Sequence, residues 1–368
     1  VRFLVALVAS LAIPLTFLLA RRFVRDGWAL FAAALMATSL LHQSFAQQAR
    51  PHAFAATLML AAVLAHLRLL SDGSWRAYAL AAAATALALG SLHYGVAVLL
   101  SALVAHALRG GGARFLDRRL LFAVAISLAA IPLFYPFLFE HVGQAREVEG
   151  GSVRLAEHAV DLSQFYGRGF AVIAQSLWNY EPLLCVLLSL AALALLFQRE
   201  CVDRRALAVV LAFALPYLLA IGLFERTYER FLLPLLPYLA VFAAWGAQRW
   251  AARLGAQKVA LGCGLALVLP ACACAKLAWL RCRPDTLVEA AQWFEARGGE
   301  ETMYVSAAPP ALDLPLLRKP DGLLFYGKRP KLPLSPWTAW QARMEPGALD
   351  VPTYDLRWLV APLGAAAA

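Results

Sequence analysis

Two short polar stretches interrupt long apolar runs, and each carries cations that could bind an anion. The first, residues 41–54, contains Arg50 directly before Pro51. A proline suits the first turn of a helix, because its missing N–H is one of the groups without a partner there. Arg50 and the free amides of a helix that begins at Pro51 could therefore bind a phosphate. The alternative is an interfacial arginine that reaches the lipid headgroups.

The second stretch, residues 225–231, packs two arginines, two glutamates and a tyrosine in front of an apolar run. This stretch could hold a phosphate and a polar acceptor, or it could be a surface salt-bridge cluster at a helix start. Its candidate cations are Arg226 and Arg230. The candidates for the lining of the same cavity are Gln48, His52, His93, Tyr94, Tyr228 and Glu229. For His93 and Tyr94, a packed pair at the membrane interface is the favoured alternative.

Composition places these stretches in a membrane protein. Of the 368 residues, 62% are hydrophobic and 15% charged, whereas about a quarter of the residues of a soluble domain are charged. The net charge of +10 comes from arginines in short clusters between apolar runs, a pattern that predicts membrane orientation and no nucleic-acid partner. The six cysteines form no CxxC pair, so we predict neither a zinc site nor a disulfide framework.

We predict an all-α polytopic membrane protein with ten spans, because ten apolar runs are long enough, or nearly so, to cross about 30 Å of hydrocarbon. These runs are 2–20, 27–45, 51–70, 76–91, 93–108, 119–138, 179–197, 206–223, 231–248 and 258–280. The fourth and fifth are separated by residues 92–94 alone. They form either a tight hairpin or one longer broken element.

Basic residues in the short connections predict the orientation of the spans. Alternate connections hold fifteen arginines and lysines on one side, against Arg50, Arg226 and Arg230 on the other. The first side is therefore cytoplasmic. The two polar stretches, a loop at about 139–178 and the tail after residue 280 then share the outer face. A loop of that length could cover a site, although a merely solvated loop looks the same.

The tail has a different composition from the rest of the chain. Residues 285–297 carry apolar side chains at helical spacing, and 302–306 and 355–360 resemble short strands. We therefore predict two domains: a multi-pass transmembrane domain at 1–280, and a small external α/β domain at 281–368.

Three segments, in order along the chain, resemble motifs of GT-C membrane glycosyltransferases of the protein O-mannosyltransferase and aminoarabinose-transferase type. Residues 20–23 (Ala-Arg-Arg-Phe) and 47–52 (Gln-Gln-Ala-Arg-Pro-His) resemble that family's "rrlfG … sQEARpY" passage. Residues 228–237 (Tyr-Glu-Arg-Phe-Leu-Leu-Pro-Leu-Leu-Pro) resemble its "RYLLPLLP" segment, and 283–293 resemble the "sRDT…A.eWi" start of its external region. Gln48 stands where the family has Glu, and His52 where it has Tyr.

The resemblance implies transfer of a monosaccharide from a polyprenyl-phosphate donor to a lipid, glycan or protein acceptor on the outer face. Arg50 and Arg230, with Arg226, would bind the donor phosphate, and membrane lipids would surround the protein. A divalent metal is a possible cofactor, but no metal site is identifiable in the chain. The expected location is the bacterial inner membrane, with the carboxyl-terminal domain in the periplasm.

The chain begins at Val1 inside an apolar run, and we expect a fragment that lacks the first span and the first external loop. In the family that loop carries the catalytic carboxylate, which would precede Val1, so the chain alone should be inactive. One alternative is a transporter or flippase, which would place ionisable residues such as His66 inside spans. The other is a non-catalytic membrane subunit that works through its external tail.

Overall fold

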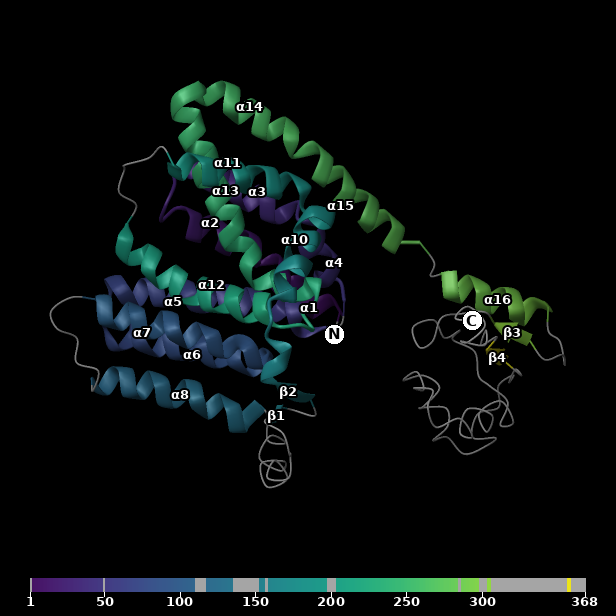
Figure 1. Cartoon of the computed structure of the whole chain (residues 1–368), viewed down its shortest axis with the longest axis horizontal. Helices are drawn as coiled ribbons and strands as arrows, with labels where there is room; N and C mark the ends of the chain where they lie inside the picture. The colour runs from purple at the N-terminus through teal and green to yellow at the C-terminus, as the bar shows by residue number, and fades with distance from the viewer. Residues whose placement is uncertain are drawn as a thin grey trace. The chain divides into compact units, whose positions relative to one another are not determined.

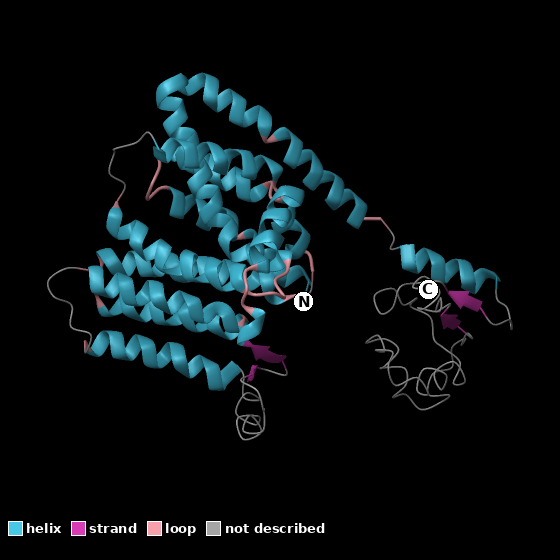
Figure 2. Ribbon diagram, in the orientation of Figure 1, coloured by secondary structure: helices cyan, strands magenta, loops and turns pink. Residues whose placement is uncertain are grey.

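The computed structural model is mainly helical (Figure 1 and Figure 2). The residues that it describes are 2–48, 50–109, 117–134, 152–155, 158–196, 203–283, 286–297, 303–305 and 356–358. The chain divides into two compact units, Val1–Leu277 and Ala278–Ala368.

The first unit is a bundle of helices. Its first half contains α1 (Arg2–Ser10), α2 (Ala12–Ala20), α3 (Asp26–Ala37), α4 (Leu40–Ala46), α5 (Pro51–Ser71), α6 (Trp75–Ser91), the 3-10 helix η1 (His93–Ala97), α7 (Val98–Leu108) and α8 (Arg118–Phe134). Its second half contains the hairpin β1 (Ser152–Leu155) and β2 (His158–Asp161), η3 (Leu162–Gln164), α10 (Arg168–Tyr180), α11 (Pro182–Leu196), α12 (Arg204–Leu223), η4 (Glu229–Leu235), α13 (Leu236–Leu254), α14 (Ala256–Ala266) and most of α15 (Val268–Arg281), whose last residues belong to the second unit.

Several of these helices are long and apolar enough to cross a membrane. Within the described residues there are five: Arg2–Ala20, Pro51–Ser71, Arg204–Leu223, Glu229–Leu254 and Ala256–Arg281. Two bent pairs, α3 with α4 and α10 with α11, would raise the number to seven. These helices support a multi-pass membrane protein. The count of ten stays a prediction, because α6 and α8 have 17 residues each, which is about 25 Å at 1.5 Å per residue.

Of the two alternatives for the fourth and fifth runs, the structure has the hairpin. Leu92, between α6 and η1, is extended. The hydroxyl of Tyr78, near the start of α6, is hydrogen-bonded to Nδ1 of His106, near the end of α7. The two helices therefore run antiparallel, and both pack against α5.

Two of the predicted segments were wrong in part. The predicted loop at 139–178 ends in a helix, since α10 already begins at Arg168; residues 139–151 and 156–157 lie outside the described residues. Polar and apolar residues alternate in α10 at helical spacing, so no apolar run marked it. The predicted span at 27–45 is broken after Ala37, and α4 turns by 55° from α3.

Small residues let neighbouring helices approach closely in the first unit. A Cβ at Gly246 of α13 would lie 2.4 Å from the Cβ of Ala191 in α11. Close backbone approach through small residues is how helices associate in lipid, where apolar burial gives little driving force. The buried core extends over α2, α3, α5, α12 and α13.

The second unit contains α16 (Thr286–Arg297), β3 (Met303–Val305) and β4 (Leu356–Trp358). Strands β3 and β4 are parallel, with Tyr304 opposite Arg357. These three elements lie within the helix and strand ranges predicted for the tail. The α/β domain itself stays a prediction, because residues 306–355 lie outside the described part of the chain.

Candidate functional site

The two polar stretches of the sequence meet where η4 packs against α4 and the start of α5. The ring of His52 stacks on Phe231, with centroids 6.1 Å apart and planes at 29°. Arg230 lies with its Cζ 4.2 Å from the centre of the Tyr228 ring and 5.3 Å from that of Phe231. Arg50, Arg230 and His93 all lie close enough to His52 to interact with it electrostatically. Residues some 180 positions apart in the sequence therefore share one site.

The local sequence explains the position of Arg50. Arg50 is the extended residue before α5, with φ −121° and ψ 145°, and Pro51 is the first helical residue, so the predicted helix start is confirmed. The side chain of Arg50 is exposed and forms no cap for the helix. The first amides of α5 have no partner within the helix, and they lie beside this cation.

The η1 turn brings His93 and Tyr94 to the same site. The Tyr94 ring lies 5.3 Å from Phe231, and its hydroxyl lies 3.5 Å from Nε2 of His52. His93 is exposed, with its ring centre 4.4 Å from that of Tyr94. Both predicted residues are therefore close to the cations.

The η4 segment is anchored through its backbone. The Tyr217 hydroxyl donates to the carbonyl oxygen of Phe231 at 3.0 Å, and the buried Thr227 hydroxyl donates to that of Ile221. This leaves the Arg230 side chain available. Within the described residues, Nε of Arg230 and Nδ1 of His52 are buried and have no hydrogen-bond partner. Buried nitrogens of this kind normally have one, so these two are candidates for contact with a ligand.

The other predicted residues are less closely involved. Gln48 donates to the carbonyl oxygen of Ser44 at 3.0 Å, and Arg226 and Tyr228 are exposed. Among the described residues, no ion pair joins Glu229 to Arg226 or Arg230. Glu225 of the same stretch pairs with Arg168 at 3.7 Å, so the alternative of a salt-bridge cluster stays open.

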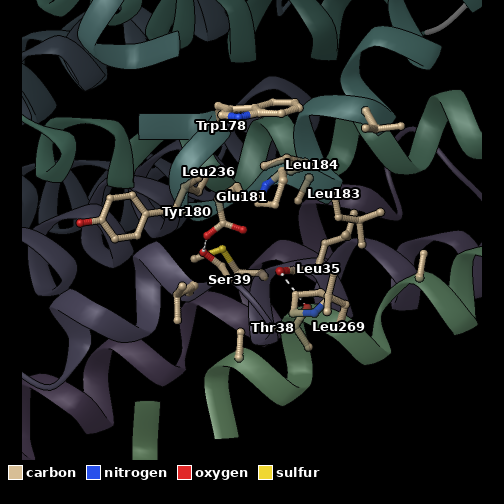
Figure 3. A pocket seen from close by; sticks show the side chains of 18 of the residues that line it. Leu35, Thr38, Ser39, Trp178, Tyr180, Glu181, Leu183, Leu184, Leu236 and Leu269 are labelled. Atoms are coloured by element: carbon tan, nitrogen blue, oxygen red, sulfur yellow. Dashed lines mark hydrogen bonds between the residues drawn. The ribbon is translucent and has the colours of Figure 1, made fainter. Parts of the chain in front are cut away.

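Sequence reasoning missed Glu181, a buried carboxylate between α10 and α11. Its Oε1 accepts hydrogen bonds from the Ser39 hydroxyl at 2.6 Å and from the Leu41 amide at 2.9 Å. Glu181 and Ser39 face each other in Figure 3, at the edge of a mostly apolar cavity of about 480 Å³. The cavity is lined from α3, the start of α4, α10, α11, α13, α14 and α15. A single Glu before Pro182 was the only sequence signal.

A metal centre is not formed by the part of the chain that the structure describes. No group of three or more His, Cys, Asp or Glu side chains there is placed to hold a metal ion. The site is thus defined by cations, aromatic rings and a histidine, which suit an anion.

The fold supports a multi-pass helical membrane protein, and the site is a group of cations, aromatic rings and a histidine where η4 packs against α4 and the start of α5. Residues 1–139 match the family model of the dolichyl-phosphate-mannose-protein mannosyltransferases. This match supports the GT-C, mannosyltransferase-like type and hence a membrane glycosyltransferase. No curated protein and no solved structure matches the chain. The matched region contains Arg50 and His52 but ends before Arg230.

Proposed function

We propose that the protein transfers a monosaccharide from a polyprenyl-phosphate donor to an acceptor on the outer face of the membrane. Arg50, Arg230 and His52 bind the phosphate of the donor lipid. The observation that carries this proposal is the pair of buried, unpartnered nitrogens on Arg230 and His52, with the charge of Arg50 acting on the same histidine. Guanidinium groups form strong charge-assisted hydrogen bonds to phosphate.

The chemistry explains why such a site needs cations. Glycosyl transfer develops positive charge on the sugar and negative charge on the departing phosphate. Donors held in place before the reaction stabilise that negative charge without reorganisation. The rings of Tyr228 and Phe231 lie against Arg230 and shield it partly from water, which strengthens its charged contacts.

The location proposed for the protein is the bacterial inner membrane, with the second unit in the periplasm and the cationic site at the outer face. Lipid, glycan and protein remain the candidate acceptors. The basic clusters of the alternate connections support this orientation through the positive-inside rule.

The test is binding of polyprenyl phosphate to the full-length protein in lipid nanodiscs. A hydrogen bond to a charged group contributes about 1.5–3 kcal/mol, so Arg50→Ala and Arg230→Ala should each weaken binding by about 10- to 150-fold. Arg205→Ala, an exposed arginine at the start of α12 on the predicted cytoplasmic side, is the control and should bind as the wild type does. Unchanged binding in both site variants would refute the proposal.

For the transporter alternative, His66 is the clearest ionisable residue inside a predicted span. His66 is fully buried, and its two ring nitrogens are hydrogen-bonded to the hydroxyls of Ser101 and Thr85, at 2.6 and 3.0 Å. Its polar atoms are thus satisfied between α5, α6 and α7, as in a structural contact. A protein that binds the lipid phosphate but transfers no sugar to any acceptor would favour the non-catalytic subunit.

A further inference from the structure

Helix α10 connects the two polar stretches that form the cationic site. Its first residues pack on the end of α12, just before Arg226 and Arg230, and its last residue is followed by Glu181, which contacts the start of α4. Helix α4 leads in turn to Gln48 and Arg50. The two ends of α10 therefore contact the two segments that lead to the cations.

The first contact is made by backbone groups. The amide of Gly167 donates to the carbonyl oxygen of Leu223 at 2.9 Å, and the amide of Glu225 donates to that of Gln164 at 2.7 Å. The carboxylate of Glu225 also lies 3.7 Å from the guanidinium of Arg168. Two hydrogen bonds and an ion pair thus fix the chain directly before Arg226.

The second contact is made through Glu181. Its Oε1 accepts from the Ser39 hydroxyl and from the Leu41 amide, while the Ser39 oxygen accepts from the amide of His42 at 3.1 Å. The amides of Leu41 and His42 belong to the first turn of α4, where the helix itself provides no acceptor. Glu181 and Ser39 therefore supply the partners that the break between α3 and α4 leaves open.

This arrangement is costly to disturb. A buried amide or hydroxyl without a partner costs about 1–3 kcal/mol, and Glu181 is only 6% exposed, so water does not readily replace it. Helix α4 has seven residues, too few to be stable by its own hydrogen bonds. Its geometry must come from contacts such as this one.

We infer that Glu181 is a positioning residue for the cationic site, because it holds α4 and thereby sets the place of Arg50 relative to Arg230. The inference rests on the proposed function for the identity of the ligand. The hydrogen bonds between Glu181 and the start of α4 do not depend on that function. We assign Glu181 no contact with the substrate.

The experiment compares Glu181→Ala with Glu181→Gln in the full-length protein. Both hydrogen bonds end on the same oxygen, which the side-chain carbonyl of glutamine can replace, whereas alanine removes the acceptor. Amide hydrogen exchange of residues 39–48 should be about tenfold faster in Glu181→Ala and close to the wild type in Glu181→Gln. Ser39→Ala removes the hydroxyl that donates to Glu181 and that accepts from the His42 amide; it should also speed the exchange and serves if Glu181→Ala does not fold.

Binding of polyprenyl phosphate is the second measurement. Glu181→Ala should weaken it at least about threefold, and Glu181→Gln should restore it. His66→Ala is the matched control: it also removes a buried polar group, but it lies fourteen residues, about 21 Å along α5, from His52. His66→Ala should leave both the exchange of α4 and the binding unchanged.

The outcomes separate this inference from the proposed function. If hydrogen exchange of α4 is the same in Glu181→Ala and Ser39→Ala as in the wild type, the positioning role is wrong, whatever the protein binds. It is also wrong if α4 exchanges faster but the lipid phosphate binds as before. If the wild type binds no polyprenyl phosphate while α4 exchanges faster in Glu181→Ala, the proposed function fails and the hold on α4 stands.

Discussion

Gly169 is the position where a single methyl group should disturb the site most clearly. A Cβ at residue 169 would lie 2.0 Å from the carbonyl oxygen of Ile221 and 2.8 Å from those of Gly222 and Phe224. Cβ atoms essentially never approach other atoms closer than 3.0 Å, so α10 would have to move by at least 1.0 Å, the difference between 3.0 and 2.0. All three obstacles are backbone atoms, and no change of rotamer can relieve them.

The expected cost of Gly169→Ala follows from two opposing effects. Overpacking that shifts the backbone costs about 1–3 kcal/mol, while replacing glycine by alanine in a helix contributes up to about 1 kcal/mol in the other direction. The variant should therefore be less stable than the wild type. Because Gly169 adjoins the contacts that precede Arg226, binding of polyprenyl phosphate should weaken as well.

Two other glycines provide matched comparisons. Gly222→Ala would meet the Phe170 ring at 2.3 Å, and that side chain can rotate, so this variant should cost less than Gly169→Ala. Gly262 of α14 has no atom within 4 Å of an added Cβ, and Gly262→Ala should stabilise the protein slightly. Denaturant or thermal unfolding in detergent would rank the three variants. A Gly169→Ala protein as stable as Gly262→Ala would refute the reasoning.

Three further predictions concern the helices behind the site. His66→Ala should lower the free energy of unfolding by at least about 1–3 kcal/mol, since two buried hydroxyls lose a partner; an unchanged denaturation midpoint would contradict this. Gly246→Ala should lower the free energy of unfolding by about 1–3 kcal/mol. Adding Ala191→Gly should restore only part of this stability, because the new Cβ would also lie 2.6 Å from the Cα of residue 191; complete restoration would contradict the geometry. Hydrogen bonds from the Ser74 amide and hydroxyl hold the pKa of Asp72 below its usual range. The wild type should therefore be more stable than Asp72→Asn at neutral pH, and this difference should disappear on acidification through the pKa of Asp72. A stability difference that does not change with pH would refute the prediction.

The parts of the structure that sequence could predict are those set by local chemistry. The start of α5 follows from Pro51, because proline is tolerated at a first helical position. The hairpin of α6 and α7 was one of two alternatives that residues 92–94 allowed, and the contacts of Tyr78 and His106 decide between them. The distribution of basic residues between the connections predicts that Arg50 and Arg230 share one face; this orientation stays a prediction, while both residues interact with His52 in the structure.

What could not be predicted depends on contacts between distant segments. Helix α10 has no long apolar run, and its position depends on Gly169, whose need for close approach to α12 is invisible in the sequence. Glu181 reads as an ordinary acidic residue beside Pro182. Its partners, Ser39 and Leu41, lie about 140 residues away, and hydrophobic periodicity contains no information on such a pairing.

The two helix breaks of the bundle explain each other. A break inside a membrane-spanning region frees backbone groups that lipid cannot satisfy, so it persists only where protein supplies the partners. The break between α3 and α4 frees amides, and the break between α10 and α11 supplies Glu181 to accept from them. Neither bend, of 55° or of 115°, would be stable against lipid alone. We therefore infer that the two breaks stabilise each other and so allow both spans to bend. The bend between α3 and α4 directs α4 toward the segment that carries Arg50.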